Sequence, residues 1–373
     1  MNDDGTQDHL LVAQVPPSRH AHRRSDGTAF LRMGDSTVKL DGPMWEELVY
    51  DREAETYEAQ PAGITMADLS GEAIDRLRVE IGARGDDIHV LRSRSLLTHD
   101  SKPTIAALLL FGTAPEQLLP QALVRVLRYR EDETGTGARQ TMEADGDRRL
   151  EGTIPNVIVR AATLIDQWAP KRRALKEGTF GPTDIIPRDA WLEAVVNAVV
   201  HRSYSMAGDH IRVSIFPHRI EVSSPGRFPG LSDPSRPLEI ARYARNPRIA
   251  RVCADLGITQ GLGEGIRRMV DDMRRAGLAD PRYRQTSTSV IVRLDATSAI
   301  SSDVMERLPH GSLEVVTLLR STGPLGTGEI ASGVNASRPT VLRWLKTLRD
   351  EGLVERRGQS PRDPRATWYV PGT

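Results

Sequence analysis

The sequence predicts a multidomain protein of the mixed α/β class, with an α/β sandwich in the middle of the chain and a small helical domain with a closing hairpin at its end. The chain has 373 residues, and because ordinary domains contain about 100–200 residues, two or three domains are expected. Apolar residues recur at helical spacing in some stretches and alternate with polar residues in others. Hydrophobic residues make up 39% of the chain and charged residues 27%, as in folded globular proteins and unlike disordered ones.

Charge and cysteine content narrow the function classes. Lysine and arginine number 50, and aspartate and glutamate also number 50, so no overall field drives the chain onto nucleic acid and DNA binding would need a local basic patch. The single cysteine, Cys253, excludes an internal disulfide framework, and no Cys/His spacing resembles a zinc site. The first residues lack a basic, apolar leader and no run of about 18 apolar residues occurs. We therefore expect a cytoplasmic protein without a membrane span.

The first third of the chain predicts short strands and one well-marked helix. Strands are expected at 10–15 and 28–34, and helices at 44–55 and 70–81. The apolar run 103–112 and the alternating stretch 122–129 predict a pair of strands. The polar, glycine-containing stretch 131–148 is expected to be a loop, which puts a domain boundary near residue 151.

The middle of the chain alternates helices with strands. Helices are expected at 154–167, 188–200, 247–256 and 266–276, and strands at 210–216, 219–223 and 288–294. Pro217 and His218 separate the first two strands by two residues, which is typical of a hairpin.

The helix at 188–200 carries a candidate catalytic pair. Glu193 and Asn197 are four residues apart and share one helix face. A carboxylate and an amide so placed suit a magnesium–phosphate site, with Asn197 as a metal ligand and Glu193 polarising a water near the terminal phosphate. His201 and Arg202, at the end of this helix, would add positive charge. For an arbitrary pair at this spacing, a solvated helix face is the commoner explanation.

Two glycine-containing loops follow the helix. Gly261, Gly263 and Gly265 stand immediately before a helix, where glycines let the backbone approach a phosphate and the helix N-terminus offers free amides. A flexible turn between two helices is the alternative. The loop Ser224-Pro225-Gly226 is weaker as a site, because Pro-Gly is first of all a turn former.

The order and spacing of five motifs resemble a known family. They are LEAVVNAVVHRSY (192–204), IRVSIFPHRIEVSSPG (211–226), RNPRIA (245–250), GLGEGIRRM (261–269) and TSTSVIVRL (286–294). Over about residues 98–297 the chain resembles the ATP-binding domain of RecG-related transcriptional regulators, which is of the GHKL type (gyrase, Hsp90, histidine kinase, MutL). The resemblance implies an α/β sandwich that holds ATP and Mg²⁺ between the sheet and the helices.

The same resemblance assigns residues. Glu193 is similar to the N-box carboxylate, Asn197 to the magnesium-binding asparagine, and the three glycines of 261–265 to the phosphate loop. Ser224, Pro225 and Gly226 stand where other GHKL proteins carry an Asp-x-Gly-x-Gly loop whose aspartate reads the adenine, and that aspartate is absent here. Ser203 replaces the aspartate of the family's usual HRDY and receives no role.

The N-terminal region resembles half of another domain. VPPS (15–18) and AFLRMGDST (29–37) are similar to the second half of a Schlafen AlbA-type domain. The acidic motif and Gly-rich turn that precede this part in full-length relatives are missing, which implies a truncated domain without nuclease activity. The basic loop around His20, His22, Arg23 and Arg24 is most simply a solvated surface.

The C-terminal segment predicts a winged helix. Helices are expected at 313–320, 327–332 and 338–351, with Thr327 and Ser337 as N-caps, followed by two strands around a Gly/Pro loop. Val341, Leu345 and Leu348 would face the core. The side chains expected to enter the major groove are Arg338, Thr340, Arg343, Trp344 and Thr347, and those expected to reach phosphate or the minor groove are Arg362 and Arg365. A winged helix that makes only protein contacts is the alternative.

Together these patterns predict five segments: a truncated Schlafen AlbA-like region at 1–95, a connecting α/β segment at 96–149, a GHKL-like ATP-binding domain at 150–297, a linker at 298–310 and a winged helix at 311–373. The leading hypothesis is a transcriptional regulator, expected to be a homodimer on double-stranded DNA, whose DNA binding responds to ATP. The alternatives are a slow Mg-dependent ATPase acting on nucleic acid and a non-catalytic scaffold or defence protein. The sequence contains no Walker A motif, which disfavours a motor helicase.

Overall fold

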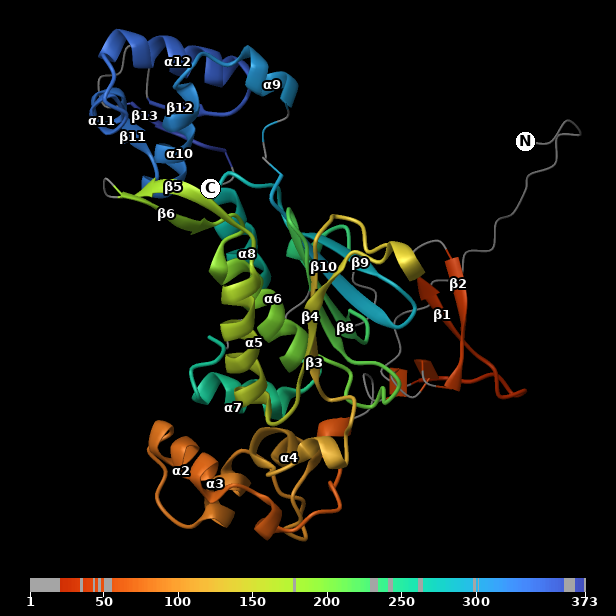
Figure 1. The fold of residues 1–373 in the computed structure, drawn as a ribbon. Helices are drawn as coiled ribbons and strands as arrows, with labels where there is room; N and C mark the ends of the chain where they lie inside the picture. Colours follow the sequence, from red (N-terminus) through yellow and green to blue (C-terminus); the bar gives the residue numbers. More distant parts are fainter. Residues whose placement is uncertain are drawn as a thin grey trace, which may run out of the picture.

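The computed structural model shows an elongated molecule with a helical part at one end, a sheet covered by helices in the middle and a compact C-terminal lobe at the other end (Figure 1). The structure describes residues 21–33, 36–42, 44–45, 48–49, 56–176, 179–228, 234–240, 244–260, 264–297, 300, 302–358 and 366–371. The strand expected at 10–15 lies outside these residues, and only parts of the helix expected at 44–55 lie within them.

A six-stranded mixed sheet forms the middle of the molecule. Its strand order is β4-β3-β7-β8-β10-β9. The strands are β3 (Val124–Tyr129), β4 (Met142–Leu150), β7 (Ile211–Ile215), β8 (Arg219–Pro225), β9 (Arg282–Gln285) and β10 (Ser289–Asp295). β3 runs parallel to β7, and the other neighbours are antiparallel. The hairpin predicted at Pro217 and His218 joins β7 to β8 and is confirmed.

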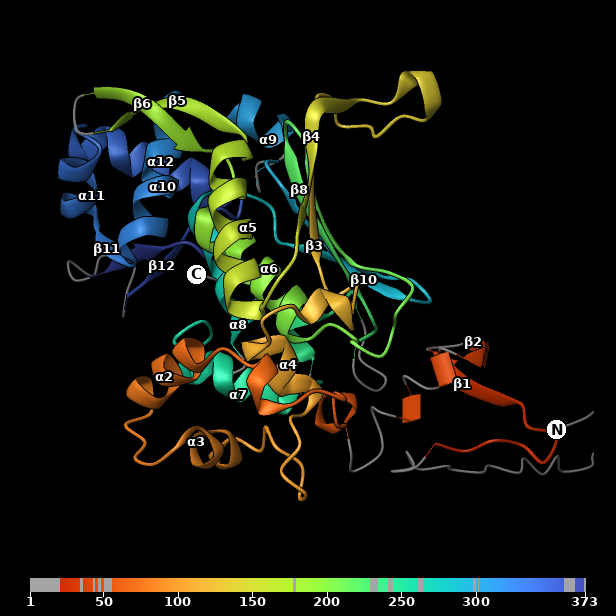
Figure 2. The same ribbon diagram turned by 60° about the horizontal axis from the view of Figure 1, so that its bottom comes forward.

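Helices cover one face of this sheet, which confirms the predicted α/β sandwich. α5 (Ile154–Trp168), α6 (Arg188–Val200) and α8 (Gly265–Arg275) lie side by side against it in two views (Figures 1 and 2), and α7 (Pro247–Asp255) packs nearby. α6 is buried on several sides, because it packs against α5, α7, α8 and the sheet. This burial explains why, after Arg188 and Asp189 in its first turn, the helix is apolar all round except at Glu193 and Asn197.

The domain boundary predicted near residue 151 is not supported by the topology. It falls directly after β4, which pairs with β3 inside the same six-stranded sheet. The polar stretch expected as a loop at 131–148 contains most of β4. Its residues form a strand because they pair along β3, although only two of the nine are buried. Pairing, more than side-chain burial, forms this edge strand.

The N-terminal part combines a small hairpin with a helical cluster. β1 (Ala29–Met33) pairs with β2 (Ser36–Leu40) around a small core of their own. The helical cluster contains η1 (Tyr57–Ala59), η2 (Met66–Asp68), α2 (Gly71–Glu80), α3 (Asp87–Ser93), α4 (Ile105–Phe111) and η3 (Pro115–Gln117). Ser70 caps α2, and this helix confirms the one predicted over 70–81.

The strand predicted at 103–112 is wrong, because this stretch forms helix α4. The Thr104 side chain caps the helix by accepting a hydrogen bond from the amide of Ala107. Every residue of α4 is buried. A short apolar run does not distinguish a buried strand from a fully buried helix, and here the cap and the Ala and Leu residues favour the helix.

The C-terminal lobe is a winged helix. Its elements are α9 (Ser302–Arg307), α10 (Ser312–Thr322), β11 (Leu325–Gly326), α11 (Thr327–Gly333), α12 (Arg338–Asp350), β12 (Glu355–Arg357) and β13 (Thr367–Tyr369). Three strands pair in the order β11-β13-β12. Val341, Leu345 and Leu348 are fully buried, as predicted. α11 starts at Thr327, so its N-cap is Gly326, and the linker expected at 298–310 contains α9.

A two-stranded ribbon between α5 and α6 was not predicted. β5 (Lys171–Lys176) pairs with β6 (Thr179–Asp184) and with no strand of the six-stranded sheet. In the part of the chain that the structure describes, no helix is both long and apolar enough to cross a membrane.

Candidate functional site

Glu193 and Asn197 converge on one point, as their spacing on α6 predicted. The amide Nδ2 of Asn197 donates a hydrogen bond to Oε1 of Glu193 over 3.1 Å, and Nη2 of Arg268, on α8, donates to Oε2 over 2.9 Å. The Glu193 side chain is only 19% exposed. Both carboxylate oxygens are thus held by donors from two neighbouring helices.

Gly265, the first residue of α8, lies directly against this pair. A Cβ atom at this position would lie 1.9 Å from Oε1 of Glu193 and 3.0 Å from Nδ2 of Asn197. A side chain at residue 265 therefore has no room, which explains the glycine. The N-terminus of a helix favours negative charge, so this placement also stabilises the carboxylate. Gly261 and Gly263 lie outside the described residues.

The electrostatic balance at Glu193 is that of a partly desolvated acid. Burial raises its pKa, while the charge of Arg268 and the hydrogen bond from Asn197 oppose the rise. Asp272, one turn further along α8, also has a pKa raised by burial, and its charge adds to the rise at Glu193. Tyr283 of β9 has a pKa raised by burial and by the charge of Glu193. The side chains of Glu193, Asp272, Arg268 and Tyr283 therefore lie near one another in a partly buried region.

The donor set fits a magnesium nucleotide. In the part of the chain that the structure describes, Oδ1 of Asn197 accepts no hydrogen bond, and Nε of Arg268 is buried without a partner. No group of three or more His, Cys, Asp or Glu residues suited to a metal occurs among the described residues. A Mg²⁺ ion usually keeps several waters and binds through one or two protein oxygens plus phosphates. Asn197, with Glu193 beside it, would offer such a minimal set.

His201 differs from its expected role as a cation. Burial, together with the charge of Arg245, lowers its pKa to about 4, so the imidazole is neutral at pH 7. Its own surface is nevertheless open to solvent. Arg202 faces the other way, into the interior, and donates to the carbonyls of Met206 and Asp209.

The loop Ser224-Pro225-Gly226 ends β8 beside the last turn of α6. The Ser224 hydroxyl donates to the carbonyl of Ala198 over 2.8 Å. Gly226 has a φ of 118°, which a glycine adopts without strain. The loop is therefore close to the helix that carries Glu193, and its one hydroxyl hydrogen is already used within the protein.

Three residues near the site were not singled out from the sequence. Arg268 and Asp272 lie on α8 and Tyr283 on β9. Arg268 and Asp272 lie four residues apart, so a helical projection of GLGEGIRRM and its continuation would have grouped them on one face with Gly265. Tyr283 offered no sequence signal, because it comes close only through the pairing of β9 with β10.

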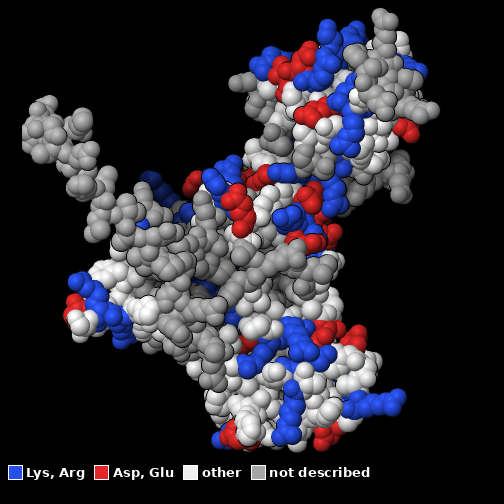
Figure 3. All heavy atoms as spheres, turned by 180° about the vertical axis from the view of Figure 1, so that it is seen from behind, with Lys and Arg blue, Asp and Glu red and all other residues white. Residues whose placement is uncertain are grey.

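The candidate DNA-binding face is the outer surface of α12. Arg338, Arg343 and Lys346 are exposed there, and Thr340 and Thr347 are partly exposed. In residues 311–373 Lys and Arg outnumber Asp and Glu, and Figure 3 shows basic side chains spread over this lobe. Acidic side chains lie between them, so the lobe carries a modest excess of positive charge, which favours DNA binding.

One expectation for this face is not met, and another lies outside the described residues. Trp344 is partly buried and packs against the hydrophobic core of the lobe, and its ring lies where a Cβ at Gly311 would meet it at 3.0 Å. It is therefore not free to enter a groove. Arg362 and Arg365 lie outside the described residues.

Comparisons with known proteins support the two halves of this architecture. Residues 208–294 match the family model described as "Putative ATP-dependent DNA helicase recG C-terminal", and residues 308–367 match the MarR family. The chain carries a RecG C-terminal-like ATPase domain followed by a MarR-type winged helix. The first match begins after α6, so it does not include Glu193, Asn197 or His201.

The whole fold has a counterpart among solved structures. The crystal structure of the DIP2311 protein from Corynebacterium diphtheriae has a TM-score of 0.54 and 19% sequence identity, and the similarity covers 95% of this chain and 72% of that one. At this identity the likeness concerns the fold alone. No curated protein matches the chain.

A helix of the ATPase-like domain also contacts the winged helix. α8 begins at Gly265, beside Glu193, and packs against α10 of the winged helix. Directly after α8, a Cβ at Gly277 would lie 2.9 Å from Nη1 of Arg320 on α10. The Nε of Arg320 is buried without a partner, and burial lowers the pKa of this guanidinium. One helix therefore contacts both the candidate phosphate site and the DNA-binding lobe.

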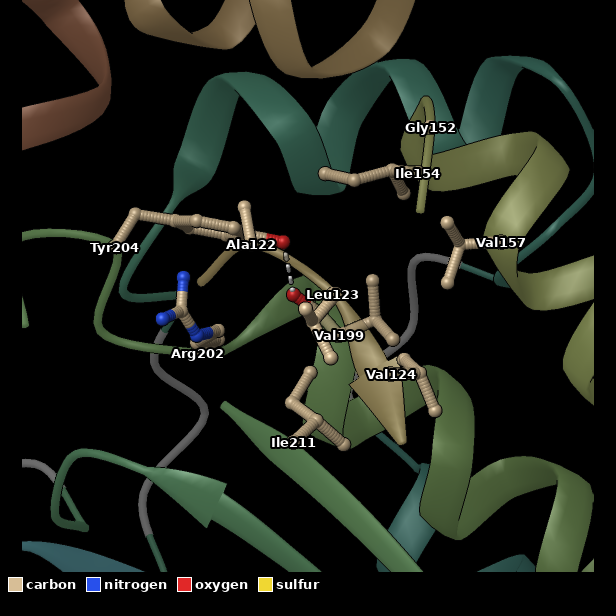
Figure 4. A pocket seen from close by; sticks show the side chains of 10 residues that line it. All are labelled: Ala122, Leu123, Val124, Gly152, Ile154, Val157, Val199, Arg202, Tyr204 and Ile211. Carbon is tan, nitrogen blue, oxygen red and sulfur yellow. Dashed lines mark hydrogen bonds between the residues drawn. The ribbon is translucent and has the colours of Figure 1, made fainter. Parts of the chain in front are cut away.

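A small cavity lies at the C-terminal end of α6 (Figure 4). Its volume is about 10 Å³, which leaves room for about one water molecule. Arg202 and Tyr204 line it together with apolar residues, and the Tyr204 hydroxyl donates to the carbonyl of Val199. The cavity is too small for a nucleotide and is not lined by Glu193 or Asn197.

Proposed function

We propose that the chain is an ATP-binding and DNA-binding transcriptional regulator, in which nucleotide occupancy of the ATPase-like domain modulates DNA binding by the winged helix. The observation that carries the proposal is the position of α8. Its first residue, Gly265, packs against Glu193 and Asn197, and the turn after its last residue packs against Arg320 of α10. A movement of α8 at its N-terminus would therefore change the contact with α10 at its C-terminus.

Glu193, Asn197 and Arg268 would hold the magnesium nucleotide. Asn197 would be the protein ligand of Mg²⁺, Glu193 would polarise a water near the terminal phosphate, and Arg268 with the first-turn amides of α8 would take the phosphates. Bound Mg²⁺ neutralises part of the charge of the triphosphate. Arg268 now donates to Glu193. If Arg268 donated this hydrogen bond to a phosphate oxygen instead, the ion pair between α6 and α8 would be lost. α8 could then shift against α10.

Arg338, Arg343 and Lys346 on α12 are the residues proposed to meet DNA. Exposed basic residues on the second helix of a helix-turn-helix face the major groove and the phosphates beside it. A homodimer would place two such helices on two half-sites, and we propose this state for the DNA-bound form. Because Trp344 packs against the core, it is left out of the interface.

The coupling is tested by DNA affinity with and without nucleotide. Fluorescence anisotropy with a labelled duplex of mixed sequence would be measured for the wild type and for Asn197→Ala, each with and without ATP and Mg²⁺. We expect ATP to change the affinity of the wild type and to leave Asn197→Ala unchanged. Equal affinities in all wild-type conditions would reject the coupling and leave a winged helix that binds DNA alone.

Slow ATP hydrolysis is the second candidate function. It is favoured by Glu193, a partly buried carboxylate whose raised pKa suits a group that accepts a proton from water. Phosphate release by the wild type that disappears in Glu193→Gln would support it. Absence of release in the wild type would leave a binding module. Failure of both ATP and DNA binding would leave the scaffold or defence role.

A further inference from the structure

The ribbon of β5 and β6 is the strongest basic feature outside the winged helix. Lys171, Arg172 and Arg173 follow one another in β5, and all three side chains are exposed. None of them makes an ion pair or hydrogen bond with the described residues. Within the two strands the only acid is Asp184, at the base of the ribbon opposite Lys171.

The ribbon is anchored to the core at its base. Its base is closed by the amide of Ile185, which donates to the carbonyl of Pro170 over 3.0 Å. Ala169 and Ile186, on either side of the ribbon, are buried in the main core. The strands themselves pair only with each other. The ribbon is therefore an arm that extends from the end of α5 and is not part of the six-stranded sheet.

The arm points to the DNA-binding lobe. In both Figure 1 and Figure 2 the ribbon lies beside the winged helix, at the end of α5 and α6 that faces that lobe. At the base of the arm, Arg148 lies over the ring of Trp168, 5.8 Å from its centroid, and this arginine is exposed as well. Exposed basic side chains therefore lie both on the ribbon and at its base, at the end of the ATPase-like domain that faces the lobe.

We propose that the β5–β6 ribbon is a second DNA-binding element, which contacts the backbone of the same duplex that the winged helix engages. A two-stranded antiparallel ribbon has the width of a DNA groove, and adjacent cations without acidic partners fit phosphates. A second copy of the chain is disfavoured as the partner, because two arms with three adjacent cations each would repel one another. The inference rests on the proposed function of the winged helix as a DNA-binding domain.

The test compares two double variants of the full-length chain. Arg172→Gln/Arg173→Gln removes two charges from the arm. Arg76→Gln/Arg84→Gln removes two exposed charges near α2, at the opposite end of the molecule (Figure 1), and serves as the matched control. Affinity for a labelled mixed-sequence duplex is measured by anisotropy over a series of KCl concentrations. A third variant, Arg172→Lys/Arg173→Lys, keeps the charge and checks that a loss is electrostatic.

Each phosphate contact contributes about 0.9 to the slope of log affinity against log salt. We therefore expect the glutamine arm variant to lower this slope by about 1.8 and to weaken binding roughly tenfold or more near physiological salt. The lysine variant should keep the wild-type slope. An arm variant with the same affinity and slope as the control would overturn the inference.

A winged-helix variant separates failure of the inference from failure of the proposed function. If Arg343→Gln/Lys346→Gln loses DNA binding while the arm variant does not, the arm proposal is wrong and the winged helix remains the DNA-binding element. If neither the arm variant nor the winged-helix variant differs from the wild type, both proposals fail.

Discussion

Substitution of Gly265 by alanine tests the nucleotide site at its tightest contact. The new methyl group would lie 1.9 Å from Oε1 of Glu193 and 2.8 Å from its carboxyl carbon, well inside contact distance. Because the carboxylate is the end of a flexible side chain, it would move and α8 would stay in place. Glu193 would then lose its hydrogen bonds from Arg268 and Asn197.

The size of the effect follows from these contacts. Hydrogen bonds to a charged group contribute about 1.5–3 kcal/mol when they are buried, and these are partly exposed. Replacing glycine by alanine in a helix stabilises the folded state by up to about 1 kcal/mol, which offsets part of this loss. We expect a net loss of about 1–2 kcal/mol in the free energy of unfolding, estimated from these two contributions. ATP affinity should fall at least about tenfold, since about 1.4 kcal/mol corresponds to that factor.

The assay has a matched control within the chain. Gly71 is the first residue of α2, as Gly265 is of α8, and no atom lies within 4 Å of a Cβ placed there. Urea unfolding and calorimetric titration with ATP and Mg²⁺ are compared for Gly71→Ala and Gly265→Ala. The control should match the wild type in ATP affinity. If both variants bind ATP equally well and unfold at the same urea concentration, Gly265 does not close the site and the reasoning is refuted.

Three further predictions concern groups outside the site. Glu58, which is fully buried and accepts hydrogen bonds from the amides of Arg248 and Ile249 at the start of α7, has a pKa raised by burial to about 7. Its contribution to stability is complete below pH 4.5 and is lost as the pH rises to about 7. This loss is about 3 kcal/mol from 1.4 kcal/mol per pKa unit, and Glu58→Gln should lack it in urea unfolding at several pH values. Arg202→Met leaves the carbonyls of Met206 and Asp209 without a donor, so thermal unfolding should show a loss of about 2 kcal/mol while calorimetry shows unchanged ATP affinity. Arg320→Met alters the contact of α10 with Gly277, and anisotropy should show a DNA affinity that no longer responds to ATP.

Each of these predictions has an outcome that contradicts it. A Glu58→Gln variant whose stability falls with pH as steeply as the wild type would show that another group titrates. A loss of ATP binding in Arg202→Met would place this arginine in the nucleotide site. An unchanged response to ATP in Arg320→Met would mean that coupling does not pass through α10.

Helix caps, apolar periodicity and turn residues predicted the elements that depend on neighbours close in the sequence. The helix over 188–200 and the capped helix beginning at Arg338 have the predicted starts, because proline and serine fix their N-termini and the apolar period fixes their faces. The pairing of β7 with β8 followed from a two-residue turn. The convergence of Glu193 on Asn197 likewise depends only on the pitch of one helix.

Elements that depend on distant partners were not predictable in this way. β4 has little apolar alternation and exists as a strand because β3 offers an edge. The ribbon of β5 and β6 is held by its own pairing and by buried residues at its base. The contact of Gly265 with Glu193, the tie from Arg268, and the neutral state of His201 arise only when α6, α8 and the segment around Arg245 pack together.

Calorimetric titration of the full chain with ATP, in the presence and absence of Mg²⁺, tests the central claim most directly when the wild type is compared with Asn197→Ala. The account predicts saturable binding of one ATP per chain that requires Mg²⁺ and weakens at least about tenfold in the variant, because a metal ligand is lost. Wild-type protein that binds no ATP, or that binds it equally well without Mg²⁺ and with alanine at residue 197, would contradict the account.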